Sequence, residues 1–220
     1  MSHCQCDGIE RCFNVQRITK ELARYRQRGP AKNTRLLVEA LLAELQAQGI
    51  EGRTLLDIGG GIGAIPHLLL EDGMRQAMVV EASAAYLAAA REEAERRGLA
   101  KQISFQHGDL VTLAPSIPAA DIVTLDRVIC CYDDMPALVG LSAARAERLY
   151  GVIYPRDAWW MHLFIRVQNA ALRIRRLPIR FFVYPTVAVD ATIRAHGLER
   201  RFSRTAGVWQ VVVYARPHLR

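Results

Sequence analysis

The 220-residue sequence contains no run of about 20 uncharged apolar residues, the length that a helix needs to cross a bilayer. Its first residues, MSHCQCDGIE, also lack the basic segment and the apolar stretch of a secretory signal peptide. These absences argue against a membrane-spanning helix and against secretion. We therefore expect the protein in the cytoplasm, with peripheral contact as the one form of membrane association left open.

Cysteine is also scarce, with five residues in the chain. Free thiols are the default in a cytoplasmic protein. Cys4, Cys6 and Cys12 are close enough in sequence to bind a soft metal, but their spacing matches no common zinc motif and a fourth ligand would be needed. We therefore predict no metal site, and we expect the adjacent Cys130 and Cys131 to pack as small apolar side chains.

The composition is that of a folded domain, with 51% hydrophobic and 23% charged residues. The length suits one domain with a short additional element. The net charge of +7 is unevenly spread, because residues 36–155 carry sixteen acidic and nine basic side chains. Residues 1–35 carry eight basic and three acidic ones, and residues 156–220 carry twelve and three. The basic flanks indicate either solvated surfaces or an anionic partner.

Short apolar runs alternate with helical segments through the middle of the chain. The runs that we expect to form parallel strands are residues 53–58, 76–81, 103–107, 121–125 and 150–154. A helix is predicted over residues 136–149, and an earlier helix is expected to be capped by Asn33 or Thr34. Two last runs, 198–204 and 208–215, are joined by a turn that is too short for a parallel connection, so we expect an antiparallel hairpin.

These elements predict an α/β fold: a Rossmann-like sheet of parallel strands with a C-terminal antiparallel hairpin and helices on both faces. Residues 1–50 are expected to form an N-terminal helical cap, and residues 51–220 the main domain with a helical insertion near 158–196. The insertion combines aromatic residues with arginines. That combination fits a core helix, a lid over a flat anionic ligand, or contact with a membrane interface.

A glycine-rich loop separates the first predicted strand from the helix that follows it. The loop reads Asp57-x-Gly59-x-Gly61-x-Gly63, and Glu81 ends the next strand 18 residues later. Such a loop lets a ligand approach the backbone, and an acid at that distance can accept hydrogen bonds from both ribose hydroxyls. The sequence therefore predicts a cofactor with a nucleoside part at this loop.

Two acidic residues favour S-adenosylmethionine over a dinucleotide, although Gly59, Gly61 and Ala64 also satisfy the dinucleotide fingerprint. Asp57 can meet a positively charged end of a ligand, whereas it would sit badly beside a pyrophosphate. Asp109 follows the third strand, where its carboxylate can accept a hydrogen bond from an adenine amino group.

The order of these motifs resembles that of class I S-adenosylmethionine-dependent methyltransferases over residues 51–216, and the layout after the fifth strand is similar to that of magnesium-protoporphyrin O-methyltransferases. The resemblance implies S-adenosylmethionine as the cofactor and S-adenosylhomocysteine as the product. The cofactor contacts that it implies are Asp57, Gly59, Gly60, Gly61, Gly63, Glu81, Ala82, Asp109, Leu110 and Asp126.

The methyl acceptor is expected beyond the carboxyl ends of the strands, where four residues are candidates for catalytic roles. Asp126 and Arg127 follow the fourth strand and either face the acceptor or pair and cap within the protein. Tyr132 either walls the methyl pocket or is a packing residue. His162 is a candidate general base or a core histidine. An ionised carboxylate acceptor would need no base at all.

We predict a methyltransferase that acts on a small, anionic and partly apolar acceptor, with transfer to oxygen, as a monomer or homodimer. A tetrapyrrole carboxylate is the most specific version. Two alternatives stay open: an RNA or protein methyltransferase that uses the basic flanks, and a protein that binds S-adenosylmethionine without turnover. A nucleic-acid partner is not expected, because the sequence has no recognised RNA-binding module. A nicotinamide oxidoreductase is the least favoured alternative.

Overall fold

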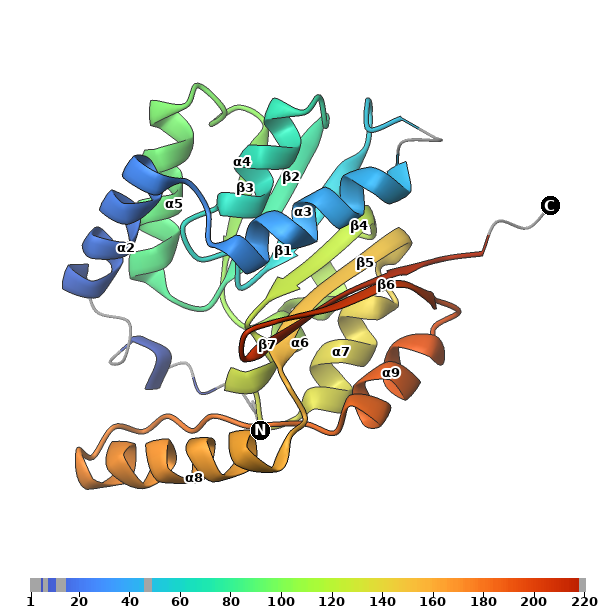
Figure 1. Ribbon diagram of the computed structural model, residues 1–220. Helices are drawn as coiled ribbons and strands as arrows, with labels where there is room; N and C mark the ends of the chain where they lie inside the picture. Colours follow the sequence, from blue (N-terminus) through green and yellow to red (C-terminus); the bar gives the residue numbers. More distant parts are fainter. Residues whose placement is uncertain (1–4, 6–7, 11–14, 46–48, 218–220) are drawn as a thin grey trace.

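The computed structural model describes residues 5, 8–10, 15–45 and 49–217, and these contain one seven-stranded sheet (Figure 1). The strands are β1 (Thr54–Ile58), β2 (Gln76–Glu81), β3 (Ile103–His107), β4 (Ala120–Asp126), β5 (Ala146–Pro155), β6 (Glu199–Ala206) and β7 (Trp209–Ala215). Their order is β3-β2-β1-β4-β5-β7-β6. β7 runs antiparallel to both neighbours, and the other pairs are parallel. The predicted fold class is confirmed.

Helices cover both faces of the sheet. One face carries α3 (Lys32–Leu45), α4 (Ala64–Glu71) and α5 (Ala84–Arg96), and the other carries α6 (Leu110–Leu113), α7 (Met135–Ala143) and α9 (Thr186–Arg194). Adjacent strand residues point to opposite faces, so Leu55 packs in the first layer and Leu56 in the second. Because both faces are covered, the central strands are apolar nearly throughout.

The helix α2 (Val15–Arg28) lies outside these two layers and packs against α5 (Figure 1). Glu93 of α5 is fully buried, and its carboxylate holds the two helices together. It accepts hydrogen bonds from Arg26 Nε at 2.8 Å, Arg96 Nη2 at 2.6 Å and Arg97 Nε at 2.8 Å. Of the predicted N-terminal cap, α2 is thus peripheral, whereas α3 covers the sheet. A division of the chain at residue 50 stays a prediction.

The helix α8 (Trp159–Ile174) follows β5 and extends away from the body of the protein (Figure 1). The chain then returns alongside it, because the Asn169 side chain donates to the Phe181 carbonyl at 2.8 Å and accepts from the Phe181 N–H at 2.9 Å. The region that was predicted to be an insertion contains α8, a returning segment and α9, and its status as an insertion stays a prediction. Within the described part of the chain, no helix is both long and apolar enough to span a bilayer.

One predicted boundary is wrong at the start of β5. Residues 146–149 were expected to be helical, but they are the first residues of the strand. Ala146 pairs with Ala120 of β4, and Leu149 pairs with Ile122. Pairing with β4 therefore outweighs the local preference of residues 146–149 for a helix.

The predicted helix cap is also wrong. α3 begins at Lys32, so Asn33 and Thr34 lie within the helix and not before it. Thr34 is buried, and its hydroxyl donates to Asp126 Oδ2 at the end of β4. A residue that was expected to cap a helix instead joins α3 to the carboxyl-terminal edge of the parallel strands.

Candidate active site

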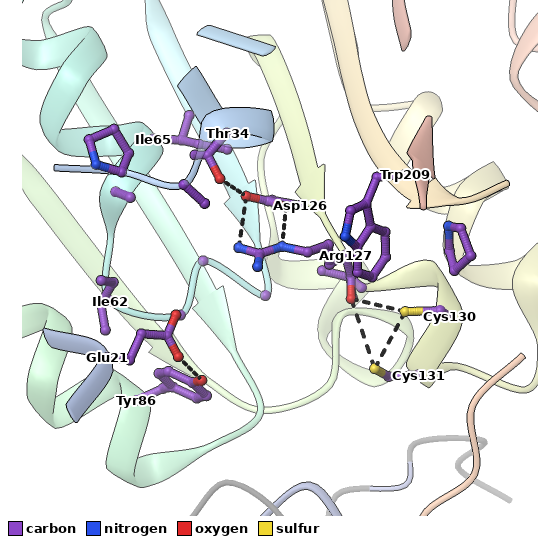
Figure 2. A pocket seen from close by; sticks show the side chains of 18 of the residues that line it. Glu21, Thr34, Ile62, Ile65, Tyr86, Asp126, Arg127, Cys130, Cys131 and Trp209 are labelled. Atoms are coloured by element: carbon purple, nitrogen blue, oxygen red, sulfur yellow. Dashed lines mark hydrogen bonds and ion pairs between the residues drawn. The ribbon is translucent and has the colours of Figure 1, made fainter. Parts of the chain in front are cut away.

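A cavity of about 390 Å³ lies at the carboxyl ends of β1, β2 and β4 (Figure 2). This edge of an open α/β sheet is where ligands bind. The wall is built from the glycine loop, the end of β4, the α2 region, α8 and the hairpin. The predicted site residues that line it are Asp57, Gly59, Gly60, Gly61, Glu81, Asp126 and Arg127.

The glycine loop passes directly over the Asp57 carboxylate. A β-carbon added at Gly60 would lie 2.6 Å from Asp57 Oδ2 and 2.9 Å from a methyl carbon of Val79. Gly59 and Gly61 have φ angles of +63° and +54°, a conformation that other residues rarely adopt. The loop needs glycine for both reasons, and its bare backbone faces the cavity.

The carboxylate of Asp57 is buried, and only one of its two oxygens has a hydrogen-bond partner among the described residues. Its Oδ1 accepts a hydrogen bond from the Thr124 hydroxyl at 2.6 Å, whereas Oδ2 has no hydrogen-bond partner among the described residues. Burial is the main cause that raises the pKa of Asp57 to about 8, and the nearby carboxylates of Asp126 and Glu81 act in the same direction. A partnerless carboxylate oxygen beneath an open loop suits a ligand that brings a cationic group.

Glu81 ends β2 and is fixed against the same loop. Its Oε2 accepts from the Gly61 N–H at 3.0 Å, and its Oε1 accepts from the Ser83 N–H at 2.9 Å. Burial raises the pKa of Glu81 above its usual range, although these backbone N–H groups oppose the shift. The carboxylate therefore has a set orientation at the cavity wall.

Asp126 and Arg127 form an ion pair in the wall of the cavity (Figure 2). Arg127 Nε donates to Asp126 Oδ1 at 2.7 Å, and the Thr34 hydroxyl donates to Asp126 Oδ2 at 2.5 Å. Arg127 has a φ angle of +63°, which is uncommon for a residue with a side chain. The two residues thus pair with each other in the wall of the cavity, and their contact with the acceptor stays a prediction.

Other side chains that line the cavity include apolar and cationic ones. Its apolar members include Met161, Phe164 and Ile165 of α8 and Trp209 of β7. Its cationic members include Arg17 and Arg24 of α2, both among the arginines that make the N-terminal flank basic.

Two further parts of the wall were missed by sequence reasoning. Tyr86 donates to Glu21 Oε2 at 2.7 Å and so joins α5 to α2 (Figure 2). Cys130 and Cys131 also line the cavity, with their sulfurs 3.8 Å apart and both directed at the Arg127 carbonyl (Figure 2). No local signal in the sequence could have found the Glu21–Tyr86 contact, because 65 residues separate its partners.

Three predicted residues form a separate cluster outside the cavity wall. Tyr132 donates from its hydroxyl to Asp109 Oδ2 at 3.1 Å, and both residues are buried. Asp109 also caps α6 by accepting from the Val111 N–H at 3.2 Å. Leu110 packs in the core. The structure thus gives Tyr132 a packing and hydrogen-bonding role instead of a position in the cavity wall, and contacts of Asp109 and Leu110 with adenine stay a prediction.

The remaining predicted residues also lie outside the wall. His162 Nε2 is 2.9 Å from Asp157 Oδ1 at the start of α8, so it is neither in the core nor at the cavity. Gly63 precedes α4, and the Ala82 carbonyl is 3.1 Å from His107 Nε2.

Three cysteines near the start of the chain were considered as ligands of a soft metal. Cys4, Cys6 and Cys12 lie outside the described residues. Across residues 15–45 and 49–217 and the few described before them, no group of three or more His, Cys, Asp or Glu side chains could hold a metal ion.

The fold is similar to several solved methyltransferase structures. Magnesium protoporphyrin IX methyltransferase from Synechocystis PCC 6803, solved with bound S-adenosylhomocysteine, has 17% identity and a TM-score of 0.70, with 95% of this chain and 98% of that chain covered. An O-methyltransferase family protein from Burkholderia thailandensis has 15% identity and a TM-score of 0.65, with 95% and 62% covered. An O-methyltransferase family 2 protein from Planctomyces limnophilus DSM 3776, in complex with apigenin, has 17% identity and a TM-score of 0.61, with 86% and 63% covered.

At these identities the solved structures share the fold with this chain, and the chain spans less than two thirds of the last two proteins. No curated protein matches the sequence. Family membership comes from the sequence itself, because residues 3–144, more than half of the chain, match the model of the O-methyltransferase domain. This stretch contains the glycine loop, Glu81 and the Asp126–Arg127 pair. The chain therefore belongs to the O-methyltransferase domain family and is a methyltransferase.

Proposed function

We propose that this protein transfers a methyl group from S-adenosylmethionine to an oxygen atom of a small, anionic and partly apolar acceptor. The observation that carries the proposal is the composition of the cavity wall. The wall includes a glycine loop with two buried carboxylates, apolar side chains of α8 and the hairpin, and arginines of α2. Methyl transfer is an in-line displacement, so donor and acceptor must occupy adjoining space.

The residues at the glycine loop fit S-adenosylmethionine. This cofactor brings an ammonium group and a sulfonium group, and Asp57 Oδ2 is a buried acceptor without a partner among the described residues. Glu81 is oriented to accept hydrogen bonds from ribose hydroxyls. When bound, the cofactor supplies an activated methyl group on a good leaving group. The protein contributes binding, orientation and exclusion of water.

The apolar and cationic lining residues suit an anionic group on an apolar frame. Arg17 and Arg24 of α2 provide positive charge, and Phe164 of α8 and Trp209 of β7 provide flat apolar surface. No histidine lies in the described wall. An ionised carboxylate needs no general base, because it is already a nucleophile at neutral pH. The similarity in fold to magnesium protoporphyrin IX methyltransferase makes a tetrapyrrole carboxylate the first acceptor to test.

A transfer assay tests the acceptor class. The protein is incubated with S-adenosylmethionine labelled in the methyl group, together with an anionic porphyrin or a neutral flavonoid. We expect label in the porphyrin that mild base releases as methanol, because a methyl ester is base-labile and a phenolic ether is not. Label found only in the flavonoid, or attached at nitrogen, would contradict the proposed acceptor.

Neutralising Arg24 should weaken binding of the acceptor but not of the cofactor. We expect Arg24→Gln to raise the KM for the anionic acceptor by about fivefold, the loss of one charge–charge contact. Arg28→Gln, one turn further along α2 and outside the cavity wall, is the matched control. Equal KM values for the two variants would show that α2 does not contact the acceptor.

Replacing Glu81 with glutamine should lower the affinity for S-adenosylmethionine by about tenfold, because a neutral acceptor makes weaker hydrogen bonds than a carboxylate. Calorimetric titration measures the change, and circular dichroism checks that the variant is folded. A folded variant with the affinity of the parent protein would show that Glu81 does not contact the ribose.

A further inference from the structure

The outer face of α8 is apolar and exposed to solvent. Trp159, Leu163, Val167, Ala170 and Ile174 recur every three or four residues and so form one stripe along the helix. Their exposed fractions include 79% for Trp159, 63% for Val167 and 82% for Ile174. A stripe of this kind on a helix normally faces a core. When it is large and exposed, such apolar surface marks an interaction site.

The opposite face of α8 is already occupied. Met161 is buried, and Ile165 and Gln168 line the cavity. The paired hydrogen bonds between Asn169 and Phe181 fix the returning chain against the helix. α8 therefore has a defined orientation, and packing onto its own domain leaves the stripe facing outward.

Arginines dominate the charge around the stripe, although Asp157 precedes α8 and contacts His162. Residues 158–189 include five arginines and no acidic residue. Arg166 and Arg173 border the stripe on α8, and Arg175, Arg176 and Arg180 follow the helix. Apolar and tryptophan side chains flanked by arginines are typical of helices that lie in the interface of an anionic bilayer.

We infer that α8 docks on the surface of an anionic lipid bilayer, with its apolar stripe in the interface and its arginines against the headgroups. Phe164 is exposed and also lines the cavity, so docking would bring the cavity wall close to the lipid. The acceptor would then enter from the membrane side. This last step rests on the proposed function, whereas docking itself does not.

Vesicle sedimentation of the full chain tests the inference. We expect the protein to sediment with vesicles of phosphatidylcholine mixed with phosphatidylglycerol and much less with phosphatidylcholine alone. Leu163→Asp should lower partitioning by at least about tenfold, because a charge would enter the apolar interface. Arg173→Gln should lower it by about fivefold, the contribution of one basic residue near an anionic surface.

Two exposed positions elsewhere provide matched controls. Val187 of α9 is 79% exposed, and Arg201 lies on the exposed side of β6. Val187→Asp and Arg201→Gln should leave vesicle binding unchanged. Absence of binding to anionic vesicles, or equal losses at Leu163 and Val187, would overturn the inference.

Two further measurements separate docking from self-association and from catalysis. Sedimentation velocity tests self-association: a dimer that Leu163→Asp converts to a monomer, without vesicle binding, would overturn docking and make the stripe an interface between copies. Transfer to a water-soluble acceptor tests the enzyme on its own. Vesicle binding without transfer would support docking and contradict the proposed function. Transfer without vesicle binding would support the proposed function and contradict docking.

Discussion

Replacing Asp57 with asparagine should lower the affinity for S-adenosylmethionine by about 100-fold, the cost of removing one partner of a buried charge pair. Asparagine keeps the size of the side chain, and its oxygen can still accept from Thr124. It loses the negative charge that lies beneath the glycine loop. Calorimetric titration at a pH above 8 measures the difference, because burial raises the pKa of Asp57 to about 8 and the carboxylate is populated there.

Asp57→Asn should not lower the stability of the protein in the absence of the cofactor, although it lowers the affinity for the cofactor. The pKa of Asp57 is higher in the native state than in the unfolded chain, so the native state holds a proton that the unfolded chain releases. The contribution of this group to the free energy of unfolding therefore falls as the pH rises towards 8. Above that pH, Asp57→Asn should unfold at the same temperature as the parent protein or at a higher one. A variant that binds S-adenosylmethionine as tightly as the parent would contradict the role of Asp57.

The same pKa predicts how cofactor affinity depends on pH in the parent protein. A cationic ligand requires the ionised carboxylate, so affinity should rise more than about tenfold as the pH increases towards 8, with release of a proton on binding. Titrations in buffers of different ionisation enthalpy detect that proton. Asp57→Asn should abolish both effects, and a persistent pH dependence in the variant would assign it to another group.

Replacing Glu93 with alanine should lower the free energy of unfolding by about 3 kcal/mol, at the lower end of the cost of breaking a buried ion pair. Its carboxylate is fully buried among Arg26, Arg96 and Arg97, which are partly exposed and can regain water. The melting temperature should fall by about 10 °C for a chain of this size. Because Glu93 joins α2 to α5, the KM for the acceptor should also rise.

Glu92 gives the matched control for this variant. It is one residue away and makes an ion pair with Arg26 at 2.8 Å, but its side chain is 65% exposed. Glu92→Ala should cost less than about 1 kcal/mol. Hydrogen bonds from Arg96, Arg97 and Arg26 hold the pKa of Glu93 well below its usual range, so its stabilising effect should be lost only in strong acid. Equal costs for the two glutamates would contradict the role of Glu93 as the anchor of α2.

The order of strands and helices could be predicted because each central strand is a short apolar run that contrasts with its neighbours. The start of β5 could not, because Glu147 and Arg148 read as part of a helix. In the structure Arg148 Nε donates to Asp121 Oδ1 at 3.1 Å, at the end of the sheet where charged side chains have partners. The pairing of this stretch with β4 therefore outweighs its local preference for a helix.

Some residues of the candidate site could likewise be predicted from the sequence, and others could not. Asp57, the glycine loop and Glu81 could be placed because each lies where a strand ends, and parallel strands bring these ends to one edge. The contacts of Thr34 and Trp209 depend on how α3 and the hairpin pack, which no local pattern encodes. Asp109 was expected at the adenine, but whether its carboxylate is open or bonded to Tyr132 is likewise a matter of packing.

The cofactor is the central claim, and calorimetric titration tests it most directly. The protein is titrated with S-adenosylmethionine, S-adenosylhomocysteine and NAD under the same conditions. We predict micromolar binding of the first two and no heat from NAD. Binding of NAD alone would mean that Gly59, Gly61 and Ala64 form a dinucleotide site, and it would contradict methyl transfer as the activity of this protein.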